Sequence, residues 1–277
     1  MTTPQSTQES SGDPDQERLN RLLAEGQTPI DPPRREALRS RLLARAADGR
    51  AGETGLLTVR LTRGSWQTLK QGVRFKPLWN GPEGASVLIE FAPGAALPAH
   101  RHNWAEEGMV LRGDLCTPEV ELGPGDYQLS PAGSRHGGIE SRGGALAFLR
   151  GTSLGHSASV WRELLGGILP LAGPESTTVR GADDGWVEIA PGVTVRELWE
   201  EGGRWSRYYR LQPGARLPEH GHRQDEECMV LEGEIYLGDI LLLAGDYQVA
   251  PPGSRHRELT TDAGALLFVR GEREVAP

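Results

Sequence analysis

Short apolar runs, broken by glycine or proline, dominate the chain from about residue 56 to residue 151. Clear examples are residues 86–91, 107–111 and 145–149, and a Gly or Pro recurs about every 8 to 12 residues. Strands of this length with turn residues at this spacing are typical of a β-sandwich or small barrel. The same pattern resumes after about residue 185. The hydrophobic pattern therefore predicts an all-β fold in two parts.

Helical periodicity is confined to segments outside these two parts. Leucines fall on one side of residues 15–25, and residues 33–47 lie between a start signal, Asp31 and two prolines, and a stop signal, Gly49. The arginines of that second segment fit either a solvated face or a binding arm for an acidic partner. A third segment, residues 157–169, has Ser157 as its N-cap. We predict a short helical arm after a disordered start, and a bridging helix between the two β parts.

The second β part repeats the first at a constant offset of 120 residues. The match begins at Trp66 and Trp186 and needs no gap, and 35 of 86 aligned positions are identical. Identical blocks include Gly-Asp-Tyr-Gln at residues 125–128 and 245–248, and Gly-Ser-Arg-His at residues 133–136 and 253–256. The units are too long for solenoid repeats, so each should have its own core. We also expect Tyr127 and Tyr247, which follow the Gly-Asp turns, to be core residues.

The repeat and the helical segments together divide the chain. We predict an N-terminal arm at residues 1–55, a first β domain at 56–152, a helical linker at 153–184 ending in a polar stretch, a second β domain at 185–271 and a tail at 272–277.

Charge and cysteine content narrow the class of protein. The formal net charge is −8, which argues against general affinity for nucleic acid or anionic membranes. No apolar run approaches the roughly 18 residues of a membrane-spanning helix, and residues 1–11 lack the apolar core of a signal peptide. The two cysteines, Cys116 and Cys228, form no paired motif. We therefore expect a cytoplasmic protein with free thiols.

Six of the seven histidines fall into two matching constellations. Two histidines stand two residues apart, a glutamate follows four residues later, and a third histidine comes after a Gly-Ser-Arg turn. The predicted metal ligands are His100, His102, Glu106 and His136 in the first domain and His220, His222, Glu226 and His256 in the second. Residues i and i+2 of a strand share a face, and three imidazoles with one carboxylate suit a divalent transition metal. The alternatives are histidines that bind no metal, or one decayed and vacant site.

The residues beside these ligands leave two choices open. Glu107 and Glu227 could also ligate, but strand alternation places them on the opposite face. Arg135 and Arg255 precede the third histidine and could either pair with an acidic group or bind an anionic ligand. We favour a structural ion pair for both arginines.

Cys228 distinguishes the two predicted sites. It lies two residues after Glu226, so both should face the second cavity, whereas the equivalent residue in the first domain is Gly108. A thiol near a divalent cation tends to ionise and then oxidise, which gives the hypothesis of a peroxide-sensitive second site. The alternative is a small, buried and inert thiol.

These residues resemble the two motifs of the cupin superfamily. The first motif, Gly-x5-His-x-His-x3-4-Glu-x6-Gly, matches from Gly94 to Gly113 and from Gly214 to Gly233. The second, Gly-x5-Pro-x-Gly-x2-His-x3-Asn, matches from Gly125 and from Gly245, except that Glu140 and Thr260 replace the final Asn. The resemblance implies two tandem double-stranded β-helix, or jelly-roll, barrels in a bicupin arrangement.

Within that superfamily the chain is similar to the ChrR-like cupins, the C-terminal module of zinc-containing anti-sigma factors. The resemblance is carried by Trp186, Ala190-Pro191-Gly192-Val193, the run from Glu226 to Gly233, and Gly245-Asp246-Tyr247. It implies one metal per cupin domain, with zinc favoured over iron, manganese or nickel. Residues 1–55 contain neither Cys nor His, so the family's sigma-binding zinc motif is missing. We therefore do not expect the chain to hold a sigma factor tightly.

Three functions follow as hypotheses, and the third of them is a metal-bound structural or binding protein without turnover. The first is a regulatory or sensory protein of the anti-sigma-factor type, which responds to an oxidant or small ligand at its metal. The second is a metal-dependent cupin enzyme, such as a dioxygenase, an isomerase or a dicarbonyl-cleaving enzyme, acting on a small molecule. Enzymes need a positioned acid or base, and the sequence offers no convincing candidate, which favours regulation slightly. We expect a small-molecule ligand, allow for a homodimer, and expect no nucleic acid or membrane partner.

Overall fold

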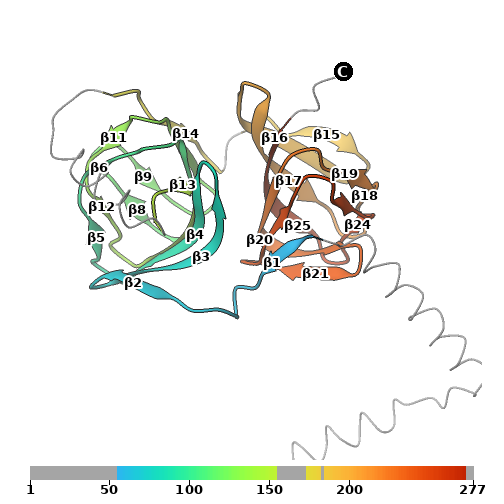
Figure 1. Cartoon of the computed structure of the whole chain (residues 1–277), viewed down its shortest axis with the longest axis horizontal. Coiled ribbons are helices and arrows are strands. Elements are labelled where there is room, and N and C mark those ends of the chain that lie inside the picture. The colour runs from blue at the N-terminus through green and yellow to red at the C-terminus, as the bar shows by residue number, and fades with distance from the viewer. Residues whose placement is uncertain (1–54, 155–172, 182–183, 273–277) are drawn as a thin grey trace, which may run out of the picture. The chain divides into compact units, whose positions relative to one another are not determined.

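A computed structural model of the chain describes residues 55–154, 173–181 and 184–272. Within these residues every regular element is a β-strand, and the strands form two barrels that lie side by side in Figure 1. The predicted all-β fold of tandem barrels is thus confirmed. The helices predicted at residues 15–25, 33–47 and 157–169 lie outside the described residues. No helix of the described part is long and apolar enough to cross a membrane.

Barrel 1 is built from twelve consecutive strands and one strand from elsewhere. The consecutive strands are β2 (Gln67–Lys70), β3 (Val73–Gly81), β4 (Gly84–Phe91), β5 (Ala96–Leu97), β6 (His100–Arg101), β7 (Glu106–Gly113), β8 (Leu115–Cys116), β9 (Glu121–Leu122), β10 (Tyr127–Ser130), β11 (Arg135–His136), β12 (Ile139–Glu140) and β13 (Ala145–Thr152). The main sheet has the order β14-β10-β7-β13-β4-β3-β2, and β5, β12, β8 and β9 form a second sheet. All pairs are antiparallel, so hairpins and short crossovers suffice to connect them.

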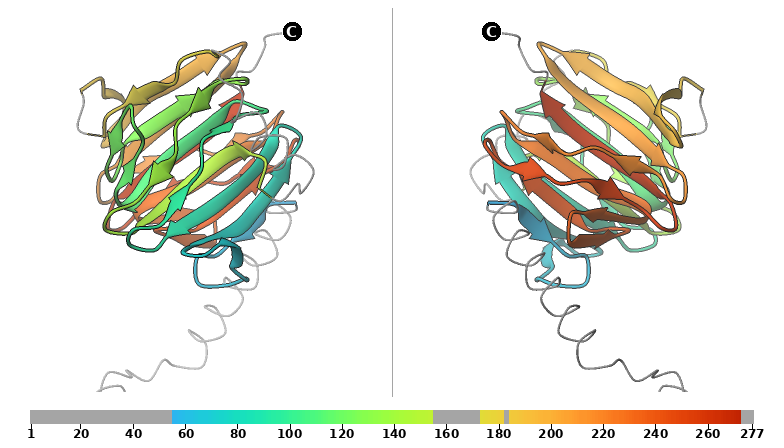
Figure 2. Two further views of the ribbon diagram at one scale, coloured as in Figure 1. Left: turned by 90° about the vertical axis from the view of Figure 1, so that its left-hand side faces the viewer. Right: turned by 90° about the vertical axis from the view of Figure 1, so that its right-hand side faces the viewer.

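Barrel 2 repeats this arrangement. Its strands are β15 (Val187–Ala190), β16 (Val193–Glu201), β17 (Arg204–Leu211), β18 (Arg216–Leu217), β19 (His220–Gly221), β20 (Glu226–Leu237), β21 (Ile240–Leu243), β22 (Tyr247–Ala250), β23 (Arg255–His256), β24 (Leu259–Thr260) and β25 (Ala265–Glu272). Its main path is β1-β22-β20-β25-β17-β16-β15. In Figure 2, barrel 1 faces the viewer in the left-hand view and barrel 2 faces the viewer in the right-hand view.

Each barrel contains one strand that precedes the other barrel in sequence. Strand β1 (Leu57–Val59) pairs with β22 of barrel 2, and strand β14 (Thr177–Val179) pairs with β10 of barrel 1. The sequence analysis had placed residue 57 in the first domain and residues 177–179 in a polar linker. It missed these strands because three residues are too few to show a period of two. The two strands occupy equivalent positions of the repeat, 120 residues apart, and each joins the barrel of the other repeat, so the exchange is reciprocal.

The exchanged strands are held by the repeated Gly-Asp turns. Asp246 accepts hydrogen bonds from the Arg60 guanidinium and the Leu61 backbone N–H, both at 2.8 Å. Asp126 accepts the matching bonds from Arg180 and the Gly181 backbone N–H, also at 2.8 Å. A carboxylate that accepts a guanidinium and a backbone donor together fixes both the position and the direction of the incoming strand.

A shared apolar layer joins the barrels. Strand alternation sends Val87 and Ile89 of β4 into barrel 1, while Leu88 between them enters this layer. The most deeply buried members of the layer are Leu88, Met109, Tyr127, Phe148, Tyr208, Met229, Tyr247 and Phe268. Since strands such as β4 are buried on both faces, they read as continuous apolar runs rather than as alternating ones.

Four charged side chains pair across the contact between the barrels and are here called the interface ring: Glu107, Arg150, Glu227 and Arg270. Arg150 donates to Glu227 at 3.1 Å, and Arg270 donates to Glu107 at 2.9 Å. Within each barrel, Glu107 is the strand partner of Arg150, and Glu227 is the strand partner of Arg270. All four are buried, so each charge depends on its partner across the interface. Glu107 and Glu227 therefore point away from the metal constellations, as alternation predicted.

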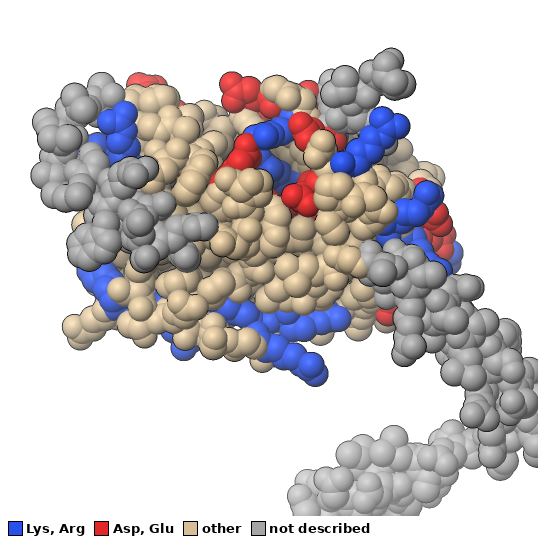
Figure 3. Space-filling view, viewed as in Figure 1, with Lys and Arg blue, Asp and Glu red and all other residues tan. Residues whose placement is uncertain are grey.

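Glu83, at the tip of the β3–β4 hairpin, breaks the symmetry of this ring. Its carboxylate lies 3.3 Å from Arg150 and 3.5 Å from Arg270, and it also bonds Arg204. The equivalent residue of barrel 2 is Gly203, which carries no charge. On the face in Figure 3, acidic and basic side chains mix along the upper edge, and uncharged side chains cover most of the remainder.

Candidate metal centres

Short paired strands bring the first constellation together. His100 on β6 is the strand partner of His136 on β11. The His102 backbone N–H donates to Ser134 O at 3.0 Å, and Gly133 N–H donates back to His102 O at 2.8 Å. Gly133 has φ of +80°, a conformation that side chains rarely adopt, which explains the glycine at this turn. Glu106 begins β7 and completes the set.

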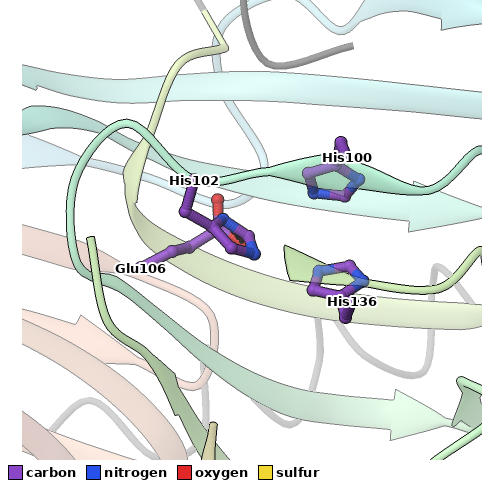
Figure 4. Close-up of side chains that lie close together, drawn as sticks. All are labelled: His100, His102, Glu106 and His136. Atoms are coloured by element: carbon purple, nitrogen blue, oxygen red, sulfur yellow. Dashed lines mark ion pairs between the residues drawn. The ribbon is translucent and has the colours of Figure 1, made fainter. Parts of the chain in front are cut away.

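The four side chains of barrel 1 converge on one point (Figure 4). One ligand atom from each of His100, His102, Glu106 and His136 lies within 4.8 Å of the others. His102, Glu106 and His136 are buried, and His100 is half-buried at the edge. This geometry lets one ion contact all four donors.

The protonation states of this cluster suit a metal. Burial and the neighbouring His100 lower the pKa of His102 to about 3, and burial with the nearby histidines lowers that of His136 to about 4. Both imidazoles are thus neutral at pH 7 and offer a lone pair. Both ring nitrogens of His102 are buried without a hydrogen-bond partner, which is costly unless something binds there. The donor set of barrel 1 therefore fits a divalent ion.

Barrel 2 repeats the geometry. His220 on β19 pairs with His256 on β23, and the four ligand atoms of His220, His222, Glu226 and His256 again lie within 4.8 Å. The Glu226 carboxylate lies 3.5 Å from His256 and 3.8 Å from each of the other two histidines. Each barrel therefore has a His/Glu set that fits one metal ion.

The electrostatics of barrel 2 differ from those of barrel 1. Burial raises the pKa of Glu106, but at Glu226 the effect of burial is outweighed by the hydrogen bond from His220 and by the nearby histidines, so its pKa is lowered. The same hydrogen bond raises the pKa of His220, whereas burial lowers that of His256 to about 4. Without metal, the hydrogen bond from His220 thus favours the charged form of Glu226, whereas burial disfavours the charged form of Glu106.

The structure brings all eight predicted ligands together in two groups of four, and metal binding by them stays a prediction. Arg255 forms an ion pair with Glu219 at 2.7 Å, which confirms the structural role favoured for it. Cys228 is buried in the barrel 2 core, and burial followed by the charge of Glu226 raises the pKa of its thiol. This supports the inert interpretation of Cys228 over the peroxide-sensitive one.

An apolar cavity of about 290 Å³ adjoins the first cluster, and the sequence analysis missed it. Its polar lining comes from Lys70, His100, Glu106 and Thr152. Its apolar lining consists of Leu69, Ile89, Phe91, Leu97, Pro98, Leu115, Ile139, Leu149 and Leu154. The sequence carried only a partial signal, because three interior positions of barrel 1 hold smaller residues than their counterparts, whereas Phe91 and Leu149 are larger than Leu211 and Val269. Ile89, Gly108 and Ala147 correspond to Tyr209, Cys228 and Leu267.

Comparison with solved structures finds chains of similar fold. A candidate dioxygenase from Nostoc punctiforme matches with a TM-score of 0.59 at 16% identity, over 80% of this chain and 84% of that one. Oxalate decarboxylase from Bacillus subtilis matches with a TM-score of 0.56 at 18% identity, over 79% and 76%. Another structure of the same decarboxylase, described by its Mn(II) centres, gives 0.53 at 17% identity, over 80% and 78%. At these identities the likeness is one of fold.

Comparison with curated protein sequences gives no match. The model of the ChrR cupin-like domain, in contrast, matches twice, at residues 54–154 and 174–273. Both matches contain a complete His/Glu cluster, and the second begins just before the exchanged strand β14. With most of its length covered by this model, and with two cupin barrels that each carry the cluster, the chain belongs to the ChrR cupin-like family.

Proposed function

We propose that barrel 1 is a metal-dependent site that binds a small molecule with an apolar body and oxidises it in a reaction of the dioxygenase type. The observation that carries this proposal is the apolar cavity whose wall includes the predicted ligands His100 and Glu106. A concave, mostly apolar site with few polar groups at one end is the usual form of a small-molecule site.

The residues around the cavity have separable roles in this proposal. Leucine and isoleucine side chains would exclude water and hold the apolar body. Lys70 would attract an acidic group of the bound molecule. Thr152 hydrogen-bonds Glu106 and would keep its carboxylate in place. A divalent ion held by the His/Glu cluster would polarise an oxygen of the small molecule.

A second candidate function is a sensory site that binds the same kind of molecule without converting it. Membership of the ChrR cupin-like family favours this function. Apart from Lys70 and the predicted ligands His100 and Glu106, the lining of the cavity contains no acid or base that could transfer a proton, which favours it too. The two functions imply different metals, because oxidation needs a redox-active ion such as iron or manganese, whereas zinc suffices for binding. Neither candidate includes tight binding of a sigma factor, which a pull-down with the host's sigma factors would test.

Metal analysis followed by oxygen-uptake assays distinguishes the two candidates. The protein would be purified, analysed for metals, reloaded anaerobically with iron, manganese or zinc, and assayed with a panel of small diketones and thiols. Oxygen uptake that requires iron or manganese and is lost in a His100→Ala, His102→Ala variant supports the enzyme. Saturable binding without oxygen uptake for every metal supports the sensor. The matched His220→Ala, His222→Ala variant should retain the behaviour of barrel 1.

A further inference from the structure

We propose that the groove between the two barrels is a second small-molecule site, which binds a zwitterion whose carboxylate and ammonium groups are separated by an apolar body. An amino carboxylate such as para-(aminomethyl)benzoate has this form. The lining of the groove includes none of the eight predicted metal ligands. The inference therefore goes beyond the function proposed for barrel 1 and does not rest on it.

The groove is a cavity of about 450 Å³ to which both barrels contribute. Its charged lining consists of three arginines and three glutamates: Arg150, Arg204, Arg270, Glu83, Glu201 and Glu272. Two partly exposed tryptophans, Trp104 of barrel 1 and Trp199 of barrel 2, supply aromatic surface between them. Clefts between domains are common places for small-molecule sites. The equal numbers of opposite charges favour a ligand without net charge.

Two buried arginines give the groove its positive side. Arg150 donates from Nε to Glu227 at 3.1 Å and from Nη2 to Glu83 at 3.3 Å. Arg270 donates from Nε to Glu107 at 2.9 Å and from Nη2 to Glu83 at 3.5 Å. Within the described part of the chain, Nη1 of neither guanidinium has a hydrogen-bond partner. Guanidinium donors that remain available beside a cavity can bind a carboxylate of a ligand.

Glu83 already places one carboxylate against these arginines. It bonds Arg204 and lies within 3.5 Å of both buried guanidinium groups. Burial alone would raise the pKa of Glu83, but the hydrogen bond from Arg204 and the charges of all three arginines outweigh burial and lower that pKa. Glu83 is thus ionised at pH 7. A ligand carboxylate beside it would add a second negative charge, which an ammonium group on the same ligand would offset.

Glu201 and Glu272 give the groove its negative side. They are the strand partners of Arg204 on β16 and β25, so they flank it on both sides. Arg204 nevertheless bonds Glu83 of the other barrel, and neither flanking carboxylate has an ion-pair partner among the described residues. Both glutamates are exposed. An ammonium group can pair with them, and a tryptophan ring of the groove can add a cation–π contact.

The repeat indicates that these charges serve the groove rather than the barrel fold. Arg150 and Arg270 are equivalent residues of the two repeats, whereas the other charged residues of the groove have uncharged counterparts. Glu83, Glu201, Arg204 and Glu272 correspond to Gly203, Gly81, Gly84 and Thr152. Each barrel therefore closes its sheets with uncharged residues at positions where the other carries a charge of the groove.

Titration of the full chain with three matched probes tests the proposal. The zwitterion para-(aminomethyl)benzoate carries both charges, para-toluate lacks the ammonium group, and para-methylbenzylamine lacks the carboxylate. In isothermal titration calorimetry the zwitterion should bind at least about tenfold more tightly than either singly charged probe, because each missing charge removes a hydrogen bond between charged groups. No binding of the zwitterion, or equal binding of a singly charged probe, would overturn the proposal.

Variants locate the binding site. Glu201→Gln combined with Glu272→Gln should remove the preference for the zwitterion over para-toluate, and Glu232→Gln, an exposed glutamate of barrel 2 outside the groove, should keep it. Ala132→Tyr puts a ring into the groove and should abolish binding. Lys70→Ala changes the cavity of barrel 1 and should leave binding unchanged. Loss of binding in Lys70→Ala with retention in Ala132→Tyr would place the probe in barrel 1 and contradict the proposal.

Tryptophan fluorescence gives a second readout in the same titrations. Trp199 lines the groove, and its counterpart in the repeat, Trp79, is not part of the lining. The change in fluorescence on adding the zwitterion should shrink in Trp199→Phe and persist in Trp79→Phe. The opposite result would place the probe away from the groove.

Discussion

The two barrels share their donor atoms and differ in what surrounds them. Both place three histidines and one glutamate within 4.8 Å, at matching positions of the repeat. Around the first cluster, Ile89, Gly108 and Ala147 border or lie beside open space, whereas Tyr209, Cys228 and Leu267 hold those positions in barrel 2. The repeat has thus kept the donor set twice, whereas the side chains at these three interior positions differ between the copies.

The interface shows where the symmetry was kept and where it was relaxed. The cross-barrel pairs of the interface ring are nearly equal in length. However, Glu227 also accepts bonds from Tyr247 and from Ser86 of barrel 1, while the Ser206 hydroxyl that corresponds to Ser86 is buried without a partner. The charges that join the barrels tolerate less change than the neutral groups beside them, because an unpaired buried charge costs more than an unpaired hydroxyl.

The largest effect should come from removing one donor set at a time. Replacing His100 and His102 by Ala, or His220 and His222 by Ala, should each lower the bound metal from two ions per chain to one. Only the first pair should also abolish binding of an apolar small molecule. Elemental analysis and ligand titration check this, and a wild-type protein that never exceeds one metal would break the equivalence of the two centres.

The next largest effect should come from removing an arginine of the interface ring. Arg150→Met leaves Glu227 buried without a cation, and Arg270→Met does the same to Glu107, which should cost about 3–5 kcal/mol of unfolding free energy in each case. The Arg270 change should cost more, because Glu107 keeps one hydroxyl donor, Tyr127, whereas Glu227 keeps Tyr247 and Ser86. Urea denaturation measures both.

A double variant is the control for the ring. Adding Glu107→Gln to Arg270→Met removes the stranded charge, so part of the lost stability should return. Equal costs for the two arginines, or no recovery in the double variant, would mean that the ring does not act as paired charges.

Exchange of lining residues should have an intermediate effect. Ile89→Tyr puts the barrel 2 residue into the barrel 1 cavity. The tyrosine ring would occupy the cavity, so the affinity for a probe with an apolar ring, such as benzohydroxamate, should fall at least about tenfold, or about 1.4 kcal/mol. Metal binding should not change. The reverse variant, Tyr209→Ile, should let barrel 2 accept the probe. Titration of the cobalt-loaded protein, followed by its visible spectrum, reports binding in each barrel.

The smallest effect concerns pH in the metal-free protein. The folded pKa values of His102 and His136, about 3 and about 4, lie below the ordinary value of 6.5. Between the folded pKa values and 6.5, the unfolded chain therefore binds more protons than the folded one. The free energy of unfolding should fall as the pH drops below about 6.5, by up to about 1.4 kcal/mol per pH unit for each histidine. In barrel 2 the raised pKa of His220 opposes the lowered one of His256. Urea denaturation at pH 7 and pH 5 should show a smaller pH dependence of the unfolding free energy in His102→Asn than in the wild type.

The repeat made much of this structure predictable. Ligand types at a constant offset indicated two clusters, and alternation separated Glu106 from Glu107, which the structure places on opposite sides of β7. The strands predicted at residues 86–91, 107–111 and 145–149 correspond to β4, β7 and β13. Local periodicity suffices for such features because each depends on neighbours within one strand or turn.

The strand exchange and the cavity were not predictable in the same way. Thr-Val-Arg occurs at residues 58–60 and again at 178–180, so the repeat extends to the exchanged strands. Sequence alone does not say which barrel each copy joins, because both offer the same Gly-Asp turn. The cavity depends on the combined volume of residues from several strands, such as Leu69, Ile89 and Leu149, which no single segment encodes.

The reciprocal exchange of β1 and β14 bears on the origin of the molecule. A polypeptide with one repeat would leave its leading strand without a sheet, and would leave the edge next to its Gly-Asp turn uncovered. Two identical copies would meet both needs at once by lending each other that strand, in a closed twofold dimer. The single chain shows this same twofold arrangement with its two halves covalently joined. Joined halves need not be identical, and the interiors of the two barrels differ at positions such as Ile89 and Tyr209.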